Sequence, residues 1–260
     1  MAGRVRVVIQ ARVGSTRLPS KIMAPLAGSP LLAHVIGRLQ AARQYDDAYA
    51  REWEVTVATT TSSSDDATER LCRELGVHCF RGSEEDVLAR YIMAAADLAD
   101  DDALVRATAD NPVYCPVRTA AIVAEHCATQ SDYVCIENLS YVVPEVMSVG
   151  ALRRMAVLAC NAFCREHVTP YFRNESGEFR VVQLPPSWRG LHPEFRLTVD
   201  TAEELRRMRR IFDAAGADER LFPIERAYEL YLPLYADEQP CLSAAAVSTE
   251  RDETATGGKA

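Results

Sequence analysis

The chain has 260 residues, of which 48% are hydrophobic, so it can bury a sizeable core. Its 37 acidic residues outnumber its 29 basic ones, and the formal net charge of −8 argues against a protein that binds nucleic acid or a membrane surface. No apolar run of 18 residues and no leader with a cleavage site is present, so we expect a soluble cytoplasmic protein.

Short β-rich runs alternate with amphipathic helical patterns along most of the chain. The expected strands are 5–11, 53–59, 77–80, 103–109, 132–136, 141–148, 179–184 and 195–199. The expected helices are 31–43, 66–75, 84–98, 116–129, 149–160, 201–214 and 221–235. This alternation predicts an α/β fold, Rossmann-like, with a mostly parallel sheet and helices on both faces. Ligands of such folds bind beyond the carboxyl ends of the strands, where the loops 11–21 and 110–116 would open.

We interpret residues 1–236 as one domain, because no internal repeat, long linker or second core divides them. Within this domain the segment 137–175 is the least regular and is interpreted as an insertion. Residues 237–260 are small and polar, which predicts a flexible C-terminal tail.

Basic residues are concentrated at the start of the chain. Residues 1–45 hold seven cations and no anion, so the remainder sums to −15 when the whole chain is at −8. Lys21 is one of only two lysines, and the other, Lys259, lies in the tail. A compact ammonium suits phosphate as a point charge, and guanidinium groups suit it as bidentate partners. This asymmetry favours a polyanion bound beside the end of the first strand, although an arginine-rich composition alone would give the same count.

The loop 11–21 lacks both the Walker A pattern and the dinucleotide-binding Gly-x-Gly-x-x-Gly pattern. Gly14, Ser15 and Thr16 can offer backbone amides and hydroxyls to phosphate oxygens. Three cations of the same loop could then surround a triphosphate, namely Arg12, Arg17 and Lys21. The plainer interpretation is a basic surface loop, which suits each of these residues singly better than it suits the set.

The run 10–21, Gln-Ala-Arg-Val-Gly-Ser-Thr-Arg-Leu-Pro-Ser-Lys, resembles the Arg-x-Gly-Ser-Thr-Arg-Leu-Pro-x-Lys signature of cytidylyltransferases. These enzymes activate acidic sugars and related metabolites as CMP derivatives. The run 80–91 is similar to the Arg-Gly-Ser-x-x-Asp-Val-Leu-x-Arg-Tyr pattern of the spore-coat polysaccharide (SpsF-type) branch. Further runs that resemble the family in the same order are 106–112, 165–171 and 196–205. The resemblance covers roughly residues 4–215 and implies a fold of the nucleotide-diphospho-sugar transferase type.

The resemblance, read with the positions of the residues at strand ends, implies a set of site residues. Those that would hold and neutralise the phosphates are Arg12, Arg17 and Lys21. Those that would contact the nucleotide are Ala11, Gly14, Ser15, Thr59, Arg81, Ser83, Asp86 and Arg106. Asp110 and Asp200 would hold Mg²⁺, which proteins bind through one or two carboxylates plus phosphate oxygens. Tyr141 and Glu145 would contact the acceptor, and a homodimer is expected to form through 137–175.

Several of these residues also suit structural roles. Asp200 could be the N-cap of the helix that follows it, and Asp110 could open a turn. Ser83 could cap a helix, with Asp86 as its first-turn carboxylate. For His167, packing or a subunit contact is favoured over catalysis.

The chain departs from the family pattern at two places. Ser20 stands where a glycine is common, and at a position that needs positive φ this would cost about 1 kcal/mol or more. The run 141–148 lacks the Gly and Asp that often precede the family's serine, which brings smaller sugar, phosphonate or phosphate acceptors into consideration. The predicted function is CMP transfer from CTP to an acidic sugar or a phosphonate- or phosphate-bearing metabolite. The alternatives are a glycosyltransferase of the same fold and a non-catalytic nucleotide-binding module.

Overall fold

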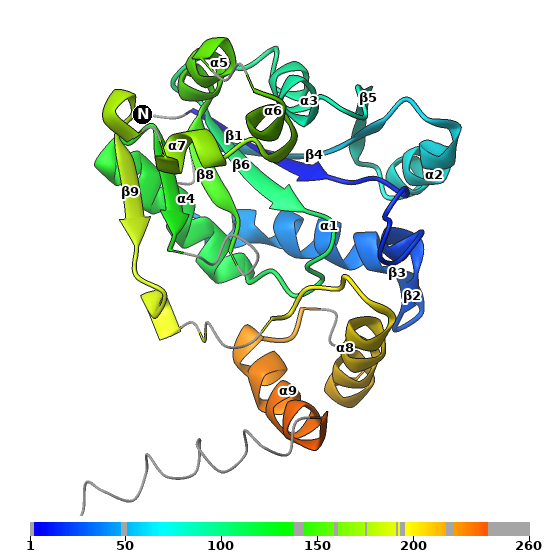
Figure 1. Cartoon of the computed structure of the whole chain (residues 1–260). Helices are drawn as coiled ribbons and strands as arrows, with labels where there is room; N and C mark the ends of the chain where they lie inside the picture. The colour runs from blue at the N-terminus through cyan, green and yellow to red at the C-terminus, as the bar shows by residue number, and fades with distance from the viewer. Residues whose placement is uncertain are drawn as a thin grey trace, which may run out of the picture.

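The structure, a computed structural model, describes residues 3–47, 51–137, 143–158, 161–174, 176–190, 192, 196–216 and 221–238. A seven-stranded sheet of order β5-β4-β1-β6-β8-β7-β9 runs through the molecule, with helices on both sides (Figure 1). The strands are Arg4–Gln10 (β1), Pro25–Leu26 (β2), Ser29–Pro30 (β3), Glu52–Thr60 (β4), His78–Gly82 (β5), Ala103–Thr108 (β6), Tyr133–Ile136 (β7), Glu145–Ser148 (β8) and Val181–Leu184 (β9). The α-helices are Leu31–Ala41 (α1), Asp66–Glu74 (α2), Val87–Ala94 (α3), Pro116–Thr129 (α4), Val149–Leu158 (α5), Ala162–His167 (α6), Pro170–Asn174 (α7), Ala202–Ala215 (α8) and Ile224–Glu238 (α9).

The predicted α/β fold class is confirmed, and the sheet is mixed but mostly parallel. β1 pairs in parallel with β4 and β6, β4 with β5, and β7 with β9. β8 is antiparallel to both of its neighbours, β6 and β7. The small hairpin β2–β3 is separate from this sheet.

The core lies on both faces of the sheet because its central strands are apolar on both sides. Along β1, Val5, Val7 and Ile9 pack into the cluster that contains α1, α2 and α4 residues, while Val8 packs into the cluster on the opposite face with α3 and α5. This alternation follows from the two-residue period of a strand. Because β1 and β6 are parallel neighbours, the loops that follow them lie at the same end of the sheet.

The segment 195–199, expected to be a strand, is not one in its described part. Residues 196–200 are extended but join no sheet. Leu197 and Val199 are buried, and the Val199 amide donates to the Asp110 carbonyl at 2.9 Å. The segment therefore crosses the loop after β6 instead of adding to an edge of the sheet, so its apolar pattern reflects burial under α8 and α9 rather than strand pairing.

Two helix starts also differ from expectation. The helix expected from residue 84 begins at Val87, with Asp86 as its N-cap. The helix after Asp200 is capped by Thr201, whose side chain and Glu204 form a capping box. The interpretation of Asp200 as an N-cap is therefore wrong, and its carboxylate is available for other contacts.

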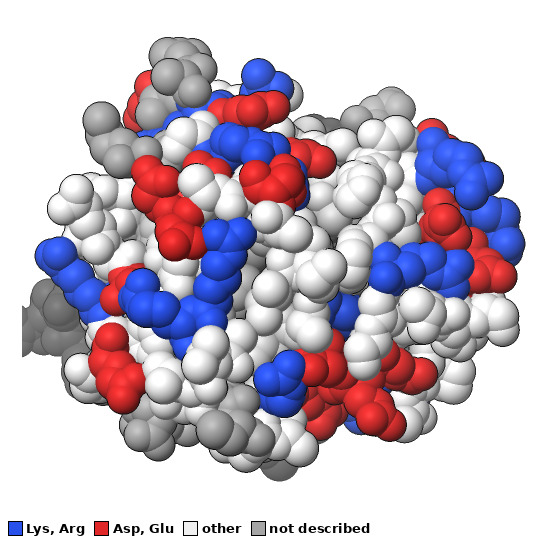
Figure 2. Space-filling view, turned by 90° about the horizontal axis from the view of Figure 1, so that it is seen from above, with Lys and Arg blue, Asp and Glu red and all other residues white. Residues whose placement is uncertain are grey.

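Charges on the outside of the molecule are mixed. On the face seen from above, described Lys and Arg side chains lie among Asp and Glu side chains (Figure 2). No described helix is long and apolar enough to cross a membrane.

Candidate active site

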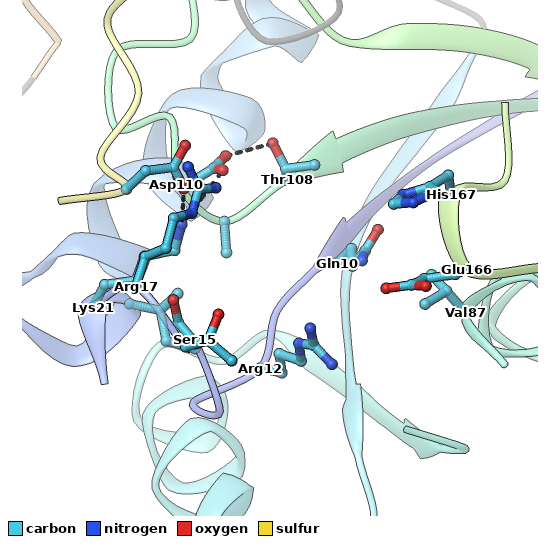
Figure 3. A pocket seen from close by; sticks show the side chains of 14 residues that line it. Gln10, Arg12, Ser15, Arg17, Lys21, Val87, Thr108, Asp110, Glu166 and His167 are labelled. Carbon is cyan, nitrogen blue, oxygen red and sulfur yellow. Dashed lines mark hydrogen bonds and ion pairs between the residues drawn. The ribbon is translucent and has the colours of Figure 1, made fainter. Parts of the chain in front are cut away.

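A cleft opens at the carboxyl ends of β1 and β6, as predicted from the α/β pattern. Its lining comes from the loop after β1, the turn after β6, the first residue of α3, the end of α6 and the residue two positions before α8. The lining residues are Gln10, Arg12, Ser15, Thr16, Arg17, Lys21, Ile22, Val87, Thr108, Ala109, Asp110, Glu166, His167 and Asp200. Lys21, Arg17 and Asp110 lie on one side, and Gln10, Val87, Glu166 and His167 lie on the other (Figure 3).

Lys21 lies between the two aspartates that were predicted to hold a metal. Its Nζ is 2.7 Å from Asp200 Oδ1 and 3.5 Å from Asp110 Oδ2. Arg17 Nη2 is 3.0 Å from the same Asp200 oxygen. Burial would raise the pKa of Asp200, but the hydrogen bond from Lys21 and the charges of Lys21 and Arg17 hold it below its ordinary value. Four residues from three distant segments thus form one charged cluster.

Asp110 is oriented by its own turn. Thr108 Oγ1 donates to Asp110 Oδ1 at 2.6 Å, and the Thr108 amide donates to the Tyr114 hydroxyl at 3.1 Å. The Asp110 carbonyl accepts from Val199, which leads directly into Asp200. One backbone hydrogen bond therefore sets the spacing of the two carboxylates.

The loop 11–21 is anchored from below by Asp65, a residue that the sequence did not single out. Asp65 is 1% exposed, and its Oδ1 accepts from the Val13 amide at 2.7 Å. Its Oδ2 accepts from the Thr60 amide at 3.3 Å. The only sequence signal was the run of cap residues after β4, which indicated a turn but not its partner. Asp65 ties the loop after β1 to the end of β4.

Ser20 adopts the backbone conformation that the family glycine would have. Its φ is 57° and its ψ is 21°, in the left-handed region. The Ser20 amide donates to the Val13 carbonyl at 3.1 Å, which closes the loop. The serine thus keeps the loop geometry at a conformational cost of about 1 kcal/mol.

Two predicted nucleotide contacts do not reach the cleft. Thr59 is fully buried in β4. Arg81 points to α2, where its Nη1 donates to Asp66 and Glu69 at 2.8 Å each. Its Nε and Nη2 donate to backbone carbonyls at 2.9 and 2.7 Å. The guanidinium of Arg81 is fully occupied within the protein.

The remaining predicted nucleotide residues divide between the loop and the start of α3. Ala11 is buried at the base of the loop, where its amide donates to the Ala58 carbonyl, and Gly14 lies near Glu84. Ser83 Oγ accepts from the Asp86 amide at 3.1 Å, but the N-cap of α3 is Asp86, whose Oδ1 accepts from the Ala89 amide, so Asp86 takes the capping role expected of Ser83.

Arg106 and Glu145 form a buried network below the cleft instead of facing it. Glu145 is fully buried, and its oxygens accept from Arg106 Nη1 at 2.7 Å, from the Tyr133 hydroxyl and from Arg173. Burial would raise the pKa of Glu145, but the charges of Arg106 and Arg173 keep it below its ordinary value. This geometry does not place Glu145 in contact with an acceptor, and Tyr141 lies outside the described residues.

The sequence interpretation missed the far wall of the cleft. Glu166 and His167, at the end of α6, line it opposite the phosphate loop, together with Gln10 (Figure 3). The His167 ring also packs edge-on against Phe163, with centroids 4.5 Å apart. The run 165–171 carried a family resemblance, but an irregular segment gave no basis for predicting which of its side chains face a ligand.

An ion pair holds this wall against α3. Arg165 Nε and Nη2 both donate to Asp86 Oδ2, at 2.8 and 2.5 Å, while Asp86 Oδ1 caps the Ala89 amide at 2.9 Å. Val87 and Glu166, each next in sequence to a member of the pair, line the cleft. Arg165 is therefore a positioning residue for the wall formed by α6.

Replacing Arg165 by Ala should loosen α6 without unfolding the protein. The two side chains are 35% and 28% exposed, so the expected loss of stability is within about 1 kcal/mol. Amide hydrogen exchange of residues 162–167 should accelerate relative to wild type. The matched control is Arg153→Ala on α5, which removes the exposed ion pair between Arg153 and Asp100. Unchanged exchange in 162–167 would show that the pair does not hold this wall.

Known proteins resemble this chain over most of its length. The cytidylyltransferase family model matches residues 6–239. The spore coat polysaccharide biosynthesis protein SpsF of Bacillus subtilis is 33% identical over 211 residues, which are 80% of this chain and 86% of that protein. A cytidylyltransferase structure from Leptospira borgpetersenii superposes with a TM-score of 0.75 at 25% identity, over 91% of this chain and 94% of that one.

A more distant structure shares the fold. CMP:2-keto-3-deoxy-manno-octonic acid synthetase, solved in complex with CTP, superposes with a TM-score of 0.61 at 16% identity, over 82% of this chain and 99% of that one. Three observations point to the same family. The family model matches most of the chain, SpsF is similar over most of its length, and the run 10–21 with the family signature lies at the mouth of the cleft. The chain belongs to the cytidylyltransferase family of enzymes.

Proposed function

We propose that this protein transfers CMP from CTP to a small acceptor and releases pyrophosphate. The observation that carries the proposal is the cluster of Lys21, Arg17, Asp110 and Asp200 at one end of a cleft whose opposite wall is polar. A triphosphate needs the cations, and its metal needs the carboxylates. A protein of the same fold solved with CTP supports the choice of nucleotide.

In the proposed reaction an acceptor oxygen attacks the α-phosphorus of CTP in line. The bond from that phosphorus to the α,β-bridging oxygen breaks, and pyrophosphate leaves with the electron pair. Positioning and charge neutralisation carry most of such a reaction. Lys21 and Arg17, now paired with Asp200, would hold the β- and γ-phosphates, and Arg12, 44% exposed at the cleft, would contact the α- and β-phosphates.

The donor set fits a magnesium ion. Asp110 and Asp200 direct carboxylate oxygens at a single point, because one ammonium lies within 3.5 Å of both. Mg²⁺ is commonly held by one or two carboxylates, waters and substrate phosphates, so no further protein ligand is required. When bound there, the ion would polarise the phosphoryl group and lower the pKa of an acceptor hydroxyl.

The acceptor would lie against the wall formed by α6. Glu166, His167 and Gln10 offer a carboxylate, an imidazole and an amide, which suit a hydroxyl-rich molecule such as a sugar. Arg12 is near enough to the same wall to face an acidic group on it (Figure 3). We therefore propose an acidic sugar, or a small metabolite bearing a phosphonate or phosphate, as the acceptor class.

The proposal includes a cytoplasmic homodimer that associates through the segment 137–175. In its described part, Val157 on α5 is 82% exposed and Phe163 on α6 is 57% exposed. The proposed subunit contact would cover both apolar side chains.

Pyrophosphate release tests the function. The protein is incubated with Mg²⁺, each of the four common nucleoside triphosphates and a panel of acidic sugars, sugar phosphates and phosphonates. We expect release with CTP and one acceptor class, and a loss of about 100-fold or more in Asp110→Asn, because one of two metal carboxylates is removed. Release from no triphosphate with any acceptor would overturn the proposal, and consumption of a nucleotide sugar instead would favour a glycosyltransferase.

A further inference from the structure

Arg90, on α3, is a buried cation for which the described residues offer no hydrogen-bond partner. It is 1% exposed, and its Nε, Nη1 and Nη2 contact no acceptor in the described part of the chain. Burial lowers the pKa of Arg90, although an arginine stays charged in proteins. Burying an unpaired charge is costly, and buried polar groups without partners concentrate where a ligand completes them.

A second buried arginine shows the usual solution. Arg38, on α1, is also 1% exposed, but its Nη1 and Nη2 donate to the carbonyls of Tyr114 and Phe222 at 3.2 and 2.9 Å. Its guanidinium also stacks on the Phe222 ring at 4.5 Å. The fold thus gives Arg38 two hydrogen bonds and leaves only its Nε unpaired, whereas all three nitrogens of Arg90 lack a partner among the described residues.

The Arg90 stem lies beside the end of β5. Side chains of a helix lean towards its N-terminus, and Val87, three residues earlier on α3, lines the cleft, whereas Arg90 itself is not part of the lining. A Cβ on Gly82 would lie 2.9 Å from Arg90 Cγ and 2.9 Å from the Phe80 ring. Gly82 is thus needed to let the arginine stem pass the end of β5.

The charged groups around Arg90 belong to the base of the phosphate loop. They are Arg12, Asp65 and Glu84, from the loop after β1, the turn after β4 and the turn after β5. In the sheet order, β4 and β5 lie on the opposite side of β1 from β6, where Lys21 meets Asp110 and Asp200. A nucleotide whose phosphates lie at Lys21 would extend its base across β1 towards Arg90.

Two of the charged groups near Arg90 form only a loose pair with each other. Arg12 and Glu84 are 3.9 Å apart and their side chains are 44% and 56% exposed. Such a pair opens at little cost. A base could then enter between the loop and the turn after β5.

We propose that Arg90 recognises the base of the nucleotide by donating two hydrogen bonds to the adjacent O2 and N3 atoms of cytosine. This inference rests on the proposed function and names a specificity-determining residue for it. Both cytosine atoms are acceptors, which matches a planar fork that only donates. In uracil N3 carries a hydrogen, so the same fork would face a donor and lose one bond. The sequence pointed to Arg81 for a nucleotide contact, but its guanidinium is occupied by α2 and by backbone carbonyls.

Calorimetric titration of CTP and UTP into the full-length protein with Mg²⁺ tests the proposal, beside thermal unfolding without ligand. In Arg90→Met the dissociation constant for CTP should rise about 10- to 100-fold, as loss of a bidentate base contact does elsewhere. UTP binding should change much less, so the CTP preference collapses. The unfolding temperature should stay level or rise, because an uncompensated buried charge is removed.

Arg38→Met is the matched control and should lower the unfolding temperature while folded protein keeps its CTP preference. Arg90→Lys retains charge and stem without the fork, and should also lose the preference. A lower unfolding temperature for Arg90→Met, like that of Arg38→Met, or an unchanged CTP preference in both Arg90 variants, would overturn the role of Arg90 alone. Wild-type protein that binds no nucleotide would overturn the proposed function together with it.

Discussion

Replacing Lys21 by Met reduces turnover about 1,000-fold or more while the protein remains folded. Methionine keeps the length of the stem and removes only the ammonium, which is placed between Asp110 and Asp200 at 3.5 and 2.7 Å. Loss of one cation that neutralises the charge growing on a leaving pyrophosphate is expected to cost this much. The rate of pyrophosphate release measures the effect, and circular dichroism checks the fold.

Stability should change little in this variant, because Asp200 keeps Arg17 at 3.0 Å. Lys21→Arg is the charge-matched comparison and should recover only part of the rate, since a planar fork does not fit a point between two carboxylates. Its partial activity separates charge from geometry. A Lys21→Met protein that retains a tenth of the wild-type rate would mean that the loop does not hold the triphosphate.

Replacing Glu145 by Gln destabilises the protein by about 3–5 kcal/mol, because removing one member of a buried ion pair leaves the others uncompensated. Glutamine keeps the volume and an acceptor oxygen, so the change isolates the charge. Glu145 is fully buried between Arg106 and Arg173, and the Arg106 side chain is only 13% exposed and cannot reach water freely. The free energy of unfolding from urea denaturation measures the loss.

The effect should depend on pH with a definite sign. The pKa of Glu145 is lowered in the folded protein, so its carboxylate stabilises the fold above its ordinary pKa of about 4.3, and this contribution is lost as the pH falls further. The gap between wild type and Glu145→Gln should therefore narrow below about pH 4. Adding Arg106→Met should restore part of the stability, since the double variant buries one unpaired charge fewer.

The same variant separates two roles of Glu145. If the carboxylate ties β6, β8 and α7 together, the free energy of unfolding falls. The KM for the acceptor then rises only indirectly, because the wall of the cleft formed by α6 becomes looser. If instead it binds the acceptor, as the sequence pattern implied, the KM rises while the free energy of unfolding stays within about 1 kcal/mol of wild type. The second result would contradict the buried network.

The chemistry of this protein was largely visible in its sequence because local patterns encode it. The cations of the loop 11–21 follow a strand pattern, and Asp110 follows another, so parallel pairing had to bring them to one edge. The positive φ of Ser20 could be anticipated from the glycine that is common at this position of the family pattern. Strand and helix types were predictable wherever periodicity was strong.

The tertiary structure alone decided which charged side chains are free to meet a ligand. Arg81 and Arg106 lie near the ends of β5 and β6, and Arg90 follows β5 on α3. Arg81 is bound by α2, Arg106 is paired with Glu145, and Arg90 has no hydrogen-bond partner among the described residues. The partners of Arg81 and Arg106 lie 12 to 39 residues away, and no periodicity reports them. The pattern of 195–199 likewise predicts a strand, but in its described part the Val199 amide donates to the Asp110 carbonyl and no sheet is joined. The sequence determined the residue types at the cleft. Long-range packing determined which charged side chains are not already paired within the protein and can therefore contact a ligand.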